Sequence, residues 1–196
     1  AMIIAGMTVV LIIVAHPWGT RIAIIGGIAS VPAVSIIRSV AVQLAQSSDS
    51  FRWGRIQAWL NPESESSGKG YQIMQGLYAL GSGGLFGKGL GNSAQKLGAV
   101  PEAQNDMIFT IVCEELGVFG AAVLTMLFVF LLYRLFFIAQ NAPDLLGALI
   151  VTGIFAQVAL QVILNIAVVL NVVPATGITL PFISYGGTSI VFLMAE

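Results

Sequence analysis

Long uninterrupted apolar runs constrain the fold of this sequence more than any other feature. The runs at residues 22–44, 107–137 and 145–173 each exceed the ~20 residues that an α-helix needs to cross a bilayer. Only 9% of the residues are charged and the mean hydropathy is +0.94, which leaves too few charges to cover a water-soluble domain. Because backbone groups in lipid must be satisfied internally, we expect an all-α, polytopic transmembrane helical bundle.

Shorter runs complete the predicted topology of a single membrane domain. Residues 1–15 and 190–196 resemble spans cut by the chain ends, so we expect an internal piece of a longer protein. Residues 46–105 are polar and are predicted to form a large extracytoplasmic loop, since the short loops on the opposite side carry the basic residues that favour the cytoplasm. Residues 174–187, rich in Pro, Gly and Ser, are expected to form a re-entrant or cap segment.

Charge and cysteine content exclude several functions. The formal net charge of -1 lacks the concentration of Lys and Arg that nucleic-acid binding requires. The single cysteine, Cys113, excludes an internal disulfide and a multi-cysteine metal site. Its apolar surroundings predict a packed side chain rather than a reactive thiol.

Carboxylates near the start of the longest run are the strongest candidates for chemistry. Asp106 is expected at the membrane–water boundary, where the simpler interpretation is an acid that complements the helix dipole. Glu114 and Glu115 follow two turns deeper, where carboxylates are costly and are functional candidates by default. Because Glu114 lies about 80° from Asp106 around a helix, these two and Thr110 are expected to line one wall of a cleft. Glu115 is expected to pair with a cation such as Arg38.

The polar loop contains two local patterns. Apolar residues between 71 and 78 recur at helical spacing, which predicts either an amphipathic helix at the membrane surface or a buried loop helix without a ligand. The glycine-rich run at 81–91 does not match a phosphate-binding loop, because Lys88 is followed by Gly89 rather than Ser or Thr and Ser82 replaces the first glycine. Its glycine content favours a run of turns.

Longer motifs are more distinctive than these local patterns. They are Trp59-Leu60-Asn61-Pro62, Pro101-Glu102, Asp106, Glu114-Glu115-Leu116-Gly117 and Gly177-Ile178-Thr179-Leu180-Pro181-Phe182-Ile183-Ser184-Tyr185-Gly186-Gly187. Together they resemble the SEDS family of membrane proteins, which includes FtsW, RodA and SpoVE, over most of the chain from about Phe51. The resemblance is to the second half of family members, in the FtsW-like division branch. The family commonly has His-Thr before its aspartate, whereas this chain has Gln104-Asn105.

The resemblance implies a peptidoglycan glycosyltransferase that polymerises lipid II, the undecaprenyl diphosphate-linked disaccharide-pentapeptide, in the bacterial cell (cytoplasmic) membrane during cell division or cell-shape maintenance. It implies a class B penicillin-binding protein and divisome or elongation proteins as partners, and Asp106 as the catalytic residue. Glycosyl transfer with inversion needs a base for the acceptor hydroxyl and positive charge beside the departing diphosphate. Substrate binding is therefore predicted for Arg52, Arg55, Lys88 and Lys96, and also for Glu114.

Cofactor and function have alternatives at this stage. The sequence identifies no definite cofactor. A divalent cation (Mg²⁺ or Mn²⁺) held by carboxylate and phosphate oxygens is an alternative to basic residues, and no metal ligand set is identified. A lipid II flippase would use the same spans and carboxylates, and a non-catalytic scaffold would recruit the penicillin-binding protein alone. Polymerisation without translocation distinguishes the enzyme from the flippase, whereas a scaffold predicts that Asp106 is dispensable.

Overall fold

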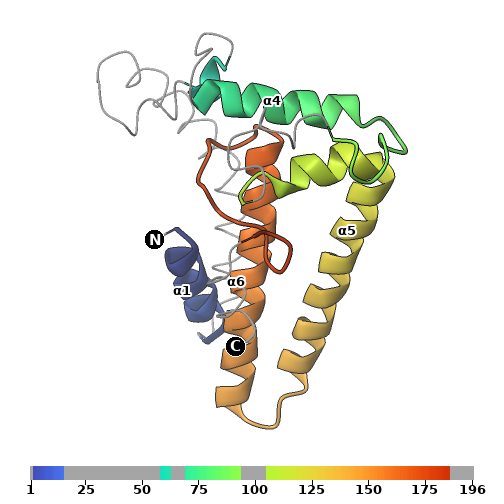
Figure 1. The fold of residues 1–196 in the computed structure, drawn as a ribbon. Helices are drawn as coiled ribbons and strands as arrows, with labels where there is room; N and C mark the ends of the chain where they lie inside the picture. The colour runs from blue at the N-terminus through green and yellow to red at the C-terminus, as the bar shows by residue number, and fades with distance from the viewer. Residues whose placement is uncertain (1, 16–57, 63–68, 94–104, 186–196) are drawn as a thin grey trace, which may run out of the picture. The chain divides into compact units, whose positions relative to one another are not determined.

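The computed structural model describes residues 2–15, 58–62, 69–93 and 105–185, and these residues are helical or irregular, with no β-strand among them (Figure 1). The labelled helices are α1 (Met2–Ala15), α4 (Lys69–Ser82), α5 (Ile108–Gln140) and α6 (Leu145–Val169). The all-α prediction is confirmed, and α5 and α6 are each long and apolar enough to cross a membrane. The predicted spans at 22–44 and 190–196 lie outside the described residues, as does much of the predicted loop.

The chain divides into two compact units, and the boundaries cross α5 at Leu132 and α6 after Leu160. In the first unit α1 packs closely on α6, because a Cβ atom added at Gly6 would lie only 2.7 Å from Cδ1 of Leu160. Small residues allow such close approach of helices in membranes. The ends of α5 and α6 in this unit form a hairpin, with the rings of Phe136 and Phe155 6.3 Å apart.

The second unit contains α4, which is amphipathic. Ile73 and Ala79 are buried, whereas Tyr78 on the opposite face is 57% exposed. The buried face packs on the start of α5, where a Cβ atom added at Gly76 would lie 2.7 Å from Cε of Met107. The helix expected between 71 and 78 is therefore present, with one face packed and one face exposed.

Helix α5 is interrupted at Gly117, whose φ of 69° and ψ of -168° are not helical. In a continuous helix the N–H groups of Val118 and Phe119 would donate to the carbonyls of Glu114 and Glu115. Because of the break, the N–H groups of Val118 and Phe119 no longer donate to the carbonyls of Glu114 and Glu115. Four backbone groups therefore need partners from another segment, because unsatisfied groups are costly in apolar surroundings.

The segment 83–93, which we call the glycine loop, provides those partners. Its hydrogen bonds to the break are Val118 N–H to Gly84 O (3.0 Å), Phe119 N–H to Leu85 O (3.1 Å), Lys88 N–H to Glu114 O (3.0 Å) and Gly89 N–H to Glu115 O (3.0 Å). The loop thus donates to the two carbonyls that the break releases and accepts from the two N–H groups. The run of turns predicted from the glycines is present, and its backbone is hydrogen-bonded to α5 at the break.

Gly87 allows the glycine loop to lie this close to α5. A Cβ atom added at Gly87 would overlap the carbonyl of Glu115, and the φ of Gly87 is 76°. Gly117 is constrained in the same way, because a Cβ atom there would overlap the backbone of the glycine loop. A side chain at either position would force the loop out of the break.

In the second unit, the segment that contains Trp59 is attached to the residues that follow α6. Asn171 has a φ of 56°, in the left-handed region that commonly closes a helix. Its carbonyl accepts a hydrogen bond of 2.9 Å from Nε1 of Trp59. The Trp59-Leu60-Asn61-Pro62 motif is therefore attached to the residues that follow α6.

We expect Gly87→Ala to lower the melting temperature of the full-length protein in detergent, because the new Cβ atom must displace the loop from Glu115. Gly81→Ala is the matched control, since no atom lies within 4 Å of its Cβ position in α4. Gly84→Ala tests strain without overlap, because its φ is 57° and the space is open. Such strain costs about 1–2 kcal/mol. Equal melting temperatures for Gly87→Ala and Gly81→Ala would contradict the close approach.

Candidate functional site

Asp106 lies in the turn immediately before α5, and side chains from two other segments hold this turn. Asn165 of α6 donates through Nδ2 to the carbonyl of Asp106 and to the carbonyl of Ile178, both at 2.8 Å. Ser184 donates through Oγ to the carbonyl of Asn105 at 2.5 Å. The turn, the end of α6 and the segment 174–185, which we call the cap segment, therefore converge at Asp106.

The side chain of Asp106 is half-buried and faces the cap segment. A Cβ atom added at Gly177 would lie 4.0 Å from Oδ2 of Asp106. Because glycine has no side chain, nothing at this position covers the carboxylate. Oxygen atoms of Gln161, Asn165 and Thr176 are buried and have no hydrogen-bond partner within the described ranges. The second unit therefore combines a carboxylate with several oxygen acceptors.

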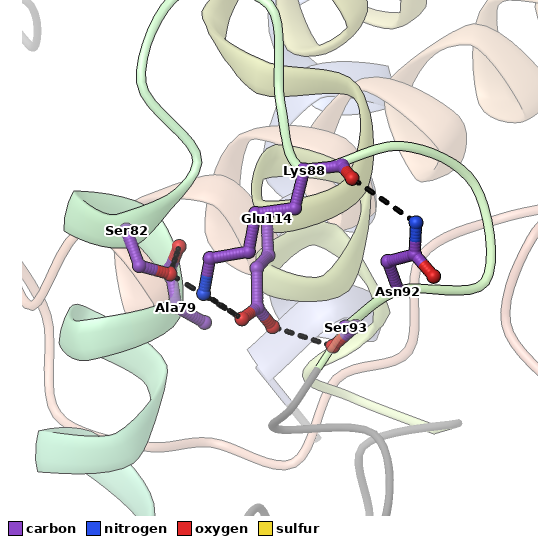
Figure 2. Close-up of polar contacts among 6 residues, drawn as sticks. All are labelled: Ala79, Ser82, Lys88, Asn92, Ser93 and Glu114. Carbon is purple, nitrogen blue, oxygen red and sulfur yellow. Dashed lines mark hydrogen bonds and ion pairs between the residues drawn. The ribbon is translucent and has the colours of Figure 1, made fainter.

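Glu114 lies in a second polar cluster, between the glycine loop and α5 (Figure 2). Its side chain is fully buried, and its carboxylate accepts from Nζ of Lys88 at 2.7 Å and from Oγ of Ser93 at 2.5 Å. Oγ of Ser82 donates to the same carboxylate at 3.3 Å. A buried carboxylate needs such partners, so this cluster fixes the loop to the helix through side chains as well as backbone.

The structure brings together two of the predicted substrate-binding residues, because Lys88 and Glu114 bind each other. The side chain of Lys88 is 38% exposed, whereas that of Glu114 is inaccessible. The prediction that Glu114 and Thr110 line an open cleft with Asp106 is wrong, because both side chains are fully buried. Thr110 donates instead to the carbonyl of Met107 at 2.7 Å. The reason is that α4 and the glycine loop cover this side of α5.

Other predicted residues cannot be placed in the site. Arg52, Arg55 and Lys96 lie outside the described residues. Glu115 is buried, and its expected partner Arg38 also lies outside them. Among the side chains that the structure describes, no three of His, Cys, Asp or Glu gather as a metal site.

Asn165 is the functional candidate that the sequence reasoning missed. A signal was available, because Gln157, Gln161 and Asn165 recur every four residues in an otherwise apolar run. Residues at this spacing share one face of a helix, and polar residues within a span commonly mark an interior contact or a functional site. The predicted packing of Cys113 is confirmed, since its side chain is 7% exposed.

An apolar groove of about 500 Å³ lies along α5 on both sides of the break. It is lined by α5 between Val112 and Leu127, by Phe86 of the glycine loop and by Ile183 of the cap segment. These segments also support the two polar clusters. A long apolar chain could therefore lie within the same unit that holds Asp106.

A family model described as cell cycle protein, for the FtsW, RodA and SpoVE proteins, matches residues 1–196. The chain belongs to this family. It is 50% identical over 144 residues to stage V sporulation protein E of Bacillus subtilis, covering 74% of the chain and 39% of that relative. It is 40% identical over 190 residues to a probable peptidoglycan glycosyltransferase FtsW of Trichlorobacter lovleyi, covering 97% of the chain and 48% of that relative.

A solved structure is also similar to this member of the FtsW/RodA/SpoVE family. It is described as a peptidoglycan synthase complex that coordinates polymerization and crosslinking, and the match has a TM-score of 0.70 at 27% identity. The match covers 100% of this chain and 52% of that chain. The chain thus spans about half or less of the length of these relatives. Family membership, with apolar helices α5 and α6, identifies a membrane protein.

We expect Lys88→Met to destabilise the full-length protein by about 1–3 kcal/mol, because it removes a charged hydrogen bond from a buried carboxylate. The double variant Lys88→Met/Glu114→Gln should be more stable than the sum of the single losses predicts, since neither charge is then left alone. Thermal unfolding in detergent measures this coupling.

Asn92→Ala is the control for this cycle. It removes only an exposed hydrogen bond to the carbonyl of Lys88 in the same loop, so its effect should stay within about 0.5 kcal/mol. Strictly additive losses in the double variant would show that the pair contributes no interaction energy.

Proposed function

We propose that the full-length protein is a multi-pass enzyme of the bacterial cell membrane that polymerises peptidoglycan glycan strands from lipid II. The observation that carries this proposal is the position of Asp106, a half-buried carboxylate held at the start of a membrane-length helix. Family membership supports it, because curated relatives are named as probable peptidoglycan glycosyltransferases.

Asp106 acts as the base in this proposal. During inverting transfer the acceptor hydroxyl oxygen bonds to the anomeric carbon, the bond to the diphosphate breaks, and the hydroxyl proton passes to the carboxylate. Partial burial beside an apolar helix favours such a role, because it weakens the hydration of the carboxylate. Glu114, by contrast, serves the reaction by holding Lys88 and the glycine loop.

Basic residues neutralise the departing diphosphate. We assign this role to Arg52, Arg55 and Lys96, with a contribution from Lys88. One N–H of Lys88 is used by Glu114, but an ammonium group has three donors, and its side chain is 38% exposed.

A divalent cation is the alternative to these basic residues. Mg²⁺ and Mn²⁺ prefer carboxylate, carbonyl and phosphate oxygens, and the Asp106 carboxylate is a ligand of this type. Polymerisation that stops on chelation and returns with added metal would support the cation.

The apolar groove along α5 supports a lipid-linked substrate. Its volume of about 500 Å³ and its wholly apolar side chains suit part of a polyprenyl tail. A flippase for the same lipid would also use such a groove. The groove therefore supports a lipid-linked substrate but does not distinguish polymerisation from transport. The reaction is distinguished by whether glycan strands form.

The proposed partner is a class B penicillin-binding protein, within a divisome or elongation assembly. The similar solved structure is described as a complex that coordinates polymerization and crosslinking. Crosslinking by a partner would complement strand synthesis by this protein. The FtsW-like division branch is our assignment, supported by the number of relatives that carry that name.

We expect Asp106→Asn in the full-length protein to reduce lipid II polymerisation by about 10²–10⁴-fold, because it removes the base while keeping the size of the side chain. Strand length on a gel, with the penicillin-binding partner present, is the measurement. Asp144→Asn is the matched control, since it makes the same change at an exposed residue before α6 and should leave activity unchanged.

Two outcomes would contradict the proposal. Near wild-type polymerisation by Asp106→Asn would exclude Asp106 as base or metal ligand. Transport of labelled lipid II across vesicles by wild-type protein that forms no strands would instead support the flippase.

A further inference from the structure

Asn165 is a buried amide that the proposed chemistry does not use. It lies on α6, in a membrane-length helix, and its side chain is 1% exposed. Burying an amide in apolar surroundings is unfavourable unless its donors find acceptors. Both N–H donors of Asn165 do so, at the carbonyls of Asp106 and Ile178.

The orientation of this amide follows from its partners. Both partners are main-chain carbonyls, which only accept hydrogen bonds, so the amide nitrogen must face them and the oxygen must face away. No apolar side chain can replace it, and a side chain that only accepts would repel both carbonyls. The contact therefore requires a donor with two hydrogens at this position.

The two carbonyls belong to segments that are not helical. One is in the turn that carries Asp106, and the other is in the cap segment, beside Gly177. Neither segment is fixed by a continuous ladder of backbone hydrogen bonds to the other. Asn165 joins them across 59 and 13 residues of sequence. Together with the hydrogen bond from Ser184 to the Asn105 carbonyl, it sets the distance between the Asp106 turn and the cap segment beside Gly177.

We propose that Asn165 is a positioning residue, which holds the Asp106 turn against the cap segment so that the carboxylate meets the acceptor hydroxyl. This inference rests on the proposed function. A base must lie within hydrogen-bond reach of its proton, and a displacement of about 1 Å can cost about 100-fold in rate. The loss should therefore appear in kcat more than in KM.

The first test is Asn165→Leu in the full-length protein, which keeps similar volume and removes both donors. We expect kcat per folded molecule to fall about 10–100-fold, with KM for lipid II changed less than about threefold. Thr152→Val is the control, because it removes a 2.7 Å side-chain hydrogen bond to the Ala148 carbonyl elsewhere on α6. The amount of folded protein is measured by size-exclusion chromatography, so that loss of folding does not count as loss of rate.

The second test is Asn165→Asp, which restores one donor only when the introduced carboxyl is protonated. The activity of this variant relative to wild type should rise as the pH is lowered, whereas that of Asn165→Leu should stay low at every pH. A purely structural role would change the folded fraction and leave the relative kcat of the folded protein independent of pH.

The outcomes separate this inference from the proposed function. If wild type polymerises lipid II, Asp106→Asn is inactive and folded Asn165→Leu keeps kcat within about twofold, the positioning role is overturned and the function stands. A relative activity of Asn165→Asp that is flat with pH would also overturn it. If Asp106→Asn remains active, the proposed function itself fails.

Discussion

The backbone hydrogen bonds that α5 loses at Gly117 determine how the described part of the second unit is built. Two carbonyls and two N–H groups are released inside an apolar helix, where water cannot satisfy them. The glycine loop supplies four complementary groups, so the loop and the break each require the other. This explains why a glycine-rich segment is fixed here and is not a tether: its backbone replaces one turn of helix, and its missing Cβ atoms permit the approach.

From this contact the support of Asp106 can be traced in two directions. On one side, the glycine loop and the Lys88–Glu114 pair hold the first turns of α5, which directly follow the Asp106 turn. On the other side, Asn165 and Ser184 hold the same turn to α6 and the cap segment. The carboxylate therefore stands between two independently fixed supports. Such pre-organisation fits the role of base proposed for Asp106, because a base with a fixed position leaves the substrate as the mobile component.

The sequence predicts features that depend on local patterns. Apolar length predicted α5 and α6, helical spacing predicted α4, and the end of the polar loop placed Asp106 at the start of a helix. Features that depend on distant contacts were not predictable. Angular arithmetic put Glu114 near the face of Asp106, but it assumes a regular helix and cannot say what covers that face. The covering partner, Ser82, is 32 residues away in sequence. Asn165 meets Asp106 across 59 residues.

The long motif of the cap segment now has a partly physical explanation. The Ile178 carbonyl accepts from Asn165, and the Ser184 hydroxyl donates to Asn105, so these positions act on the backbone of the site. The hydrogen bonds that hold the Asp106 turn use main-chain carbonyls, and none of these three uses the Asp106 carboxylate. These three hydrogen bonds therefore position the Asp106 turn through its main chain and the main chain of the cap segment. Changing Asn165 removes two of the three bonds while keeping the Asp106 carboxylate, and so loosens the turn that carries it.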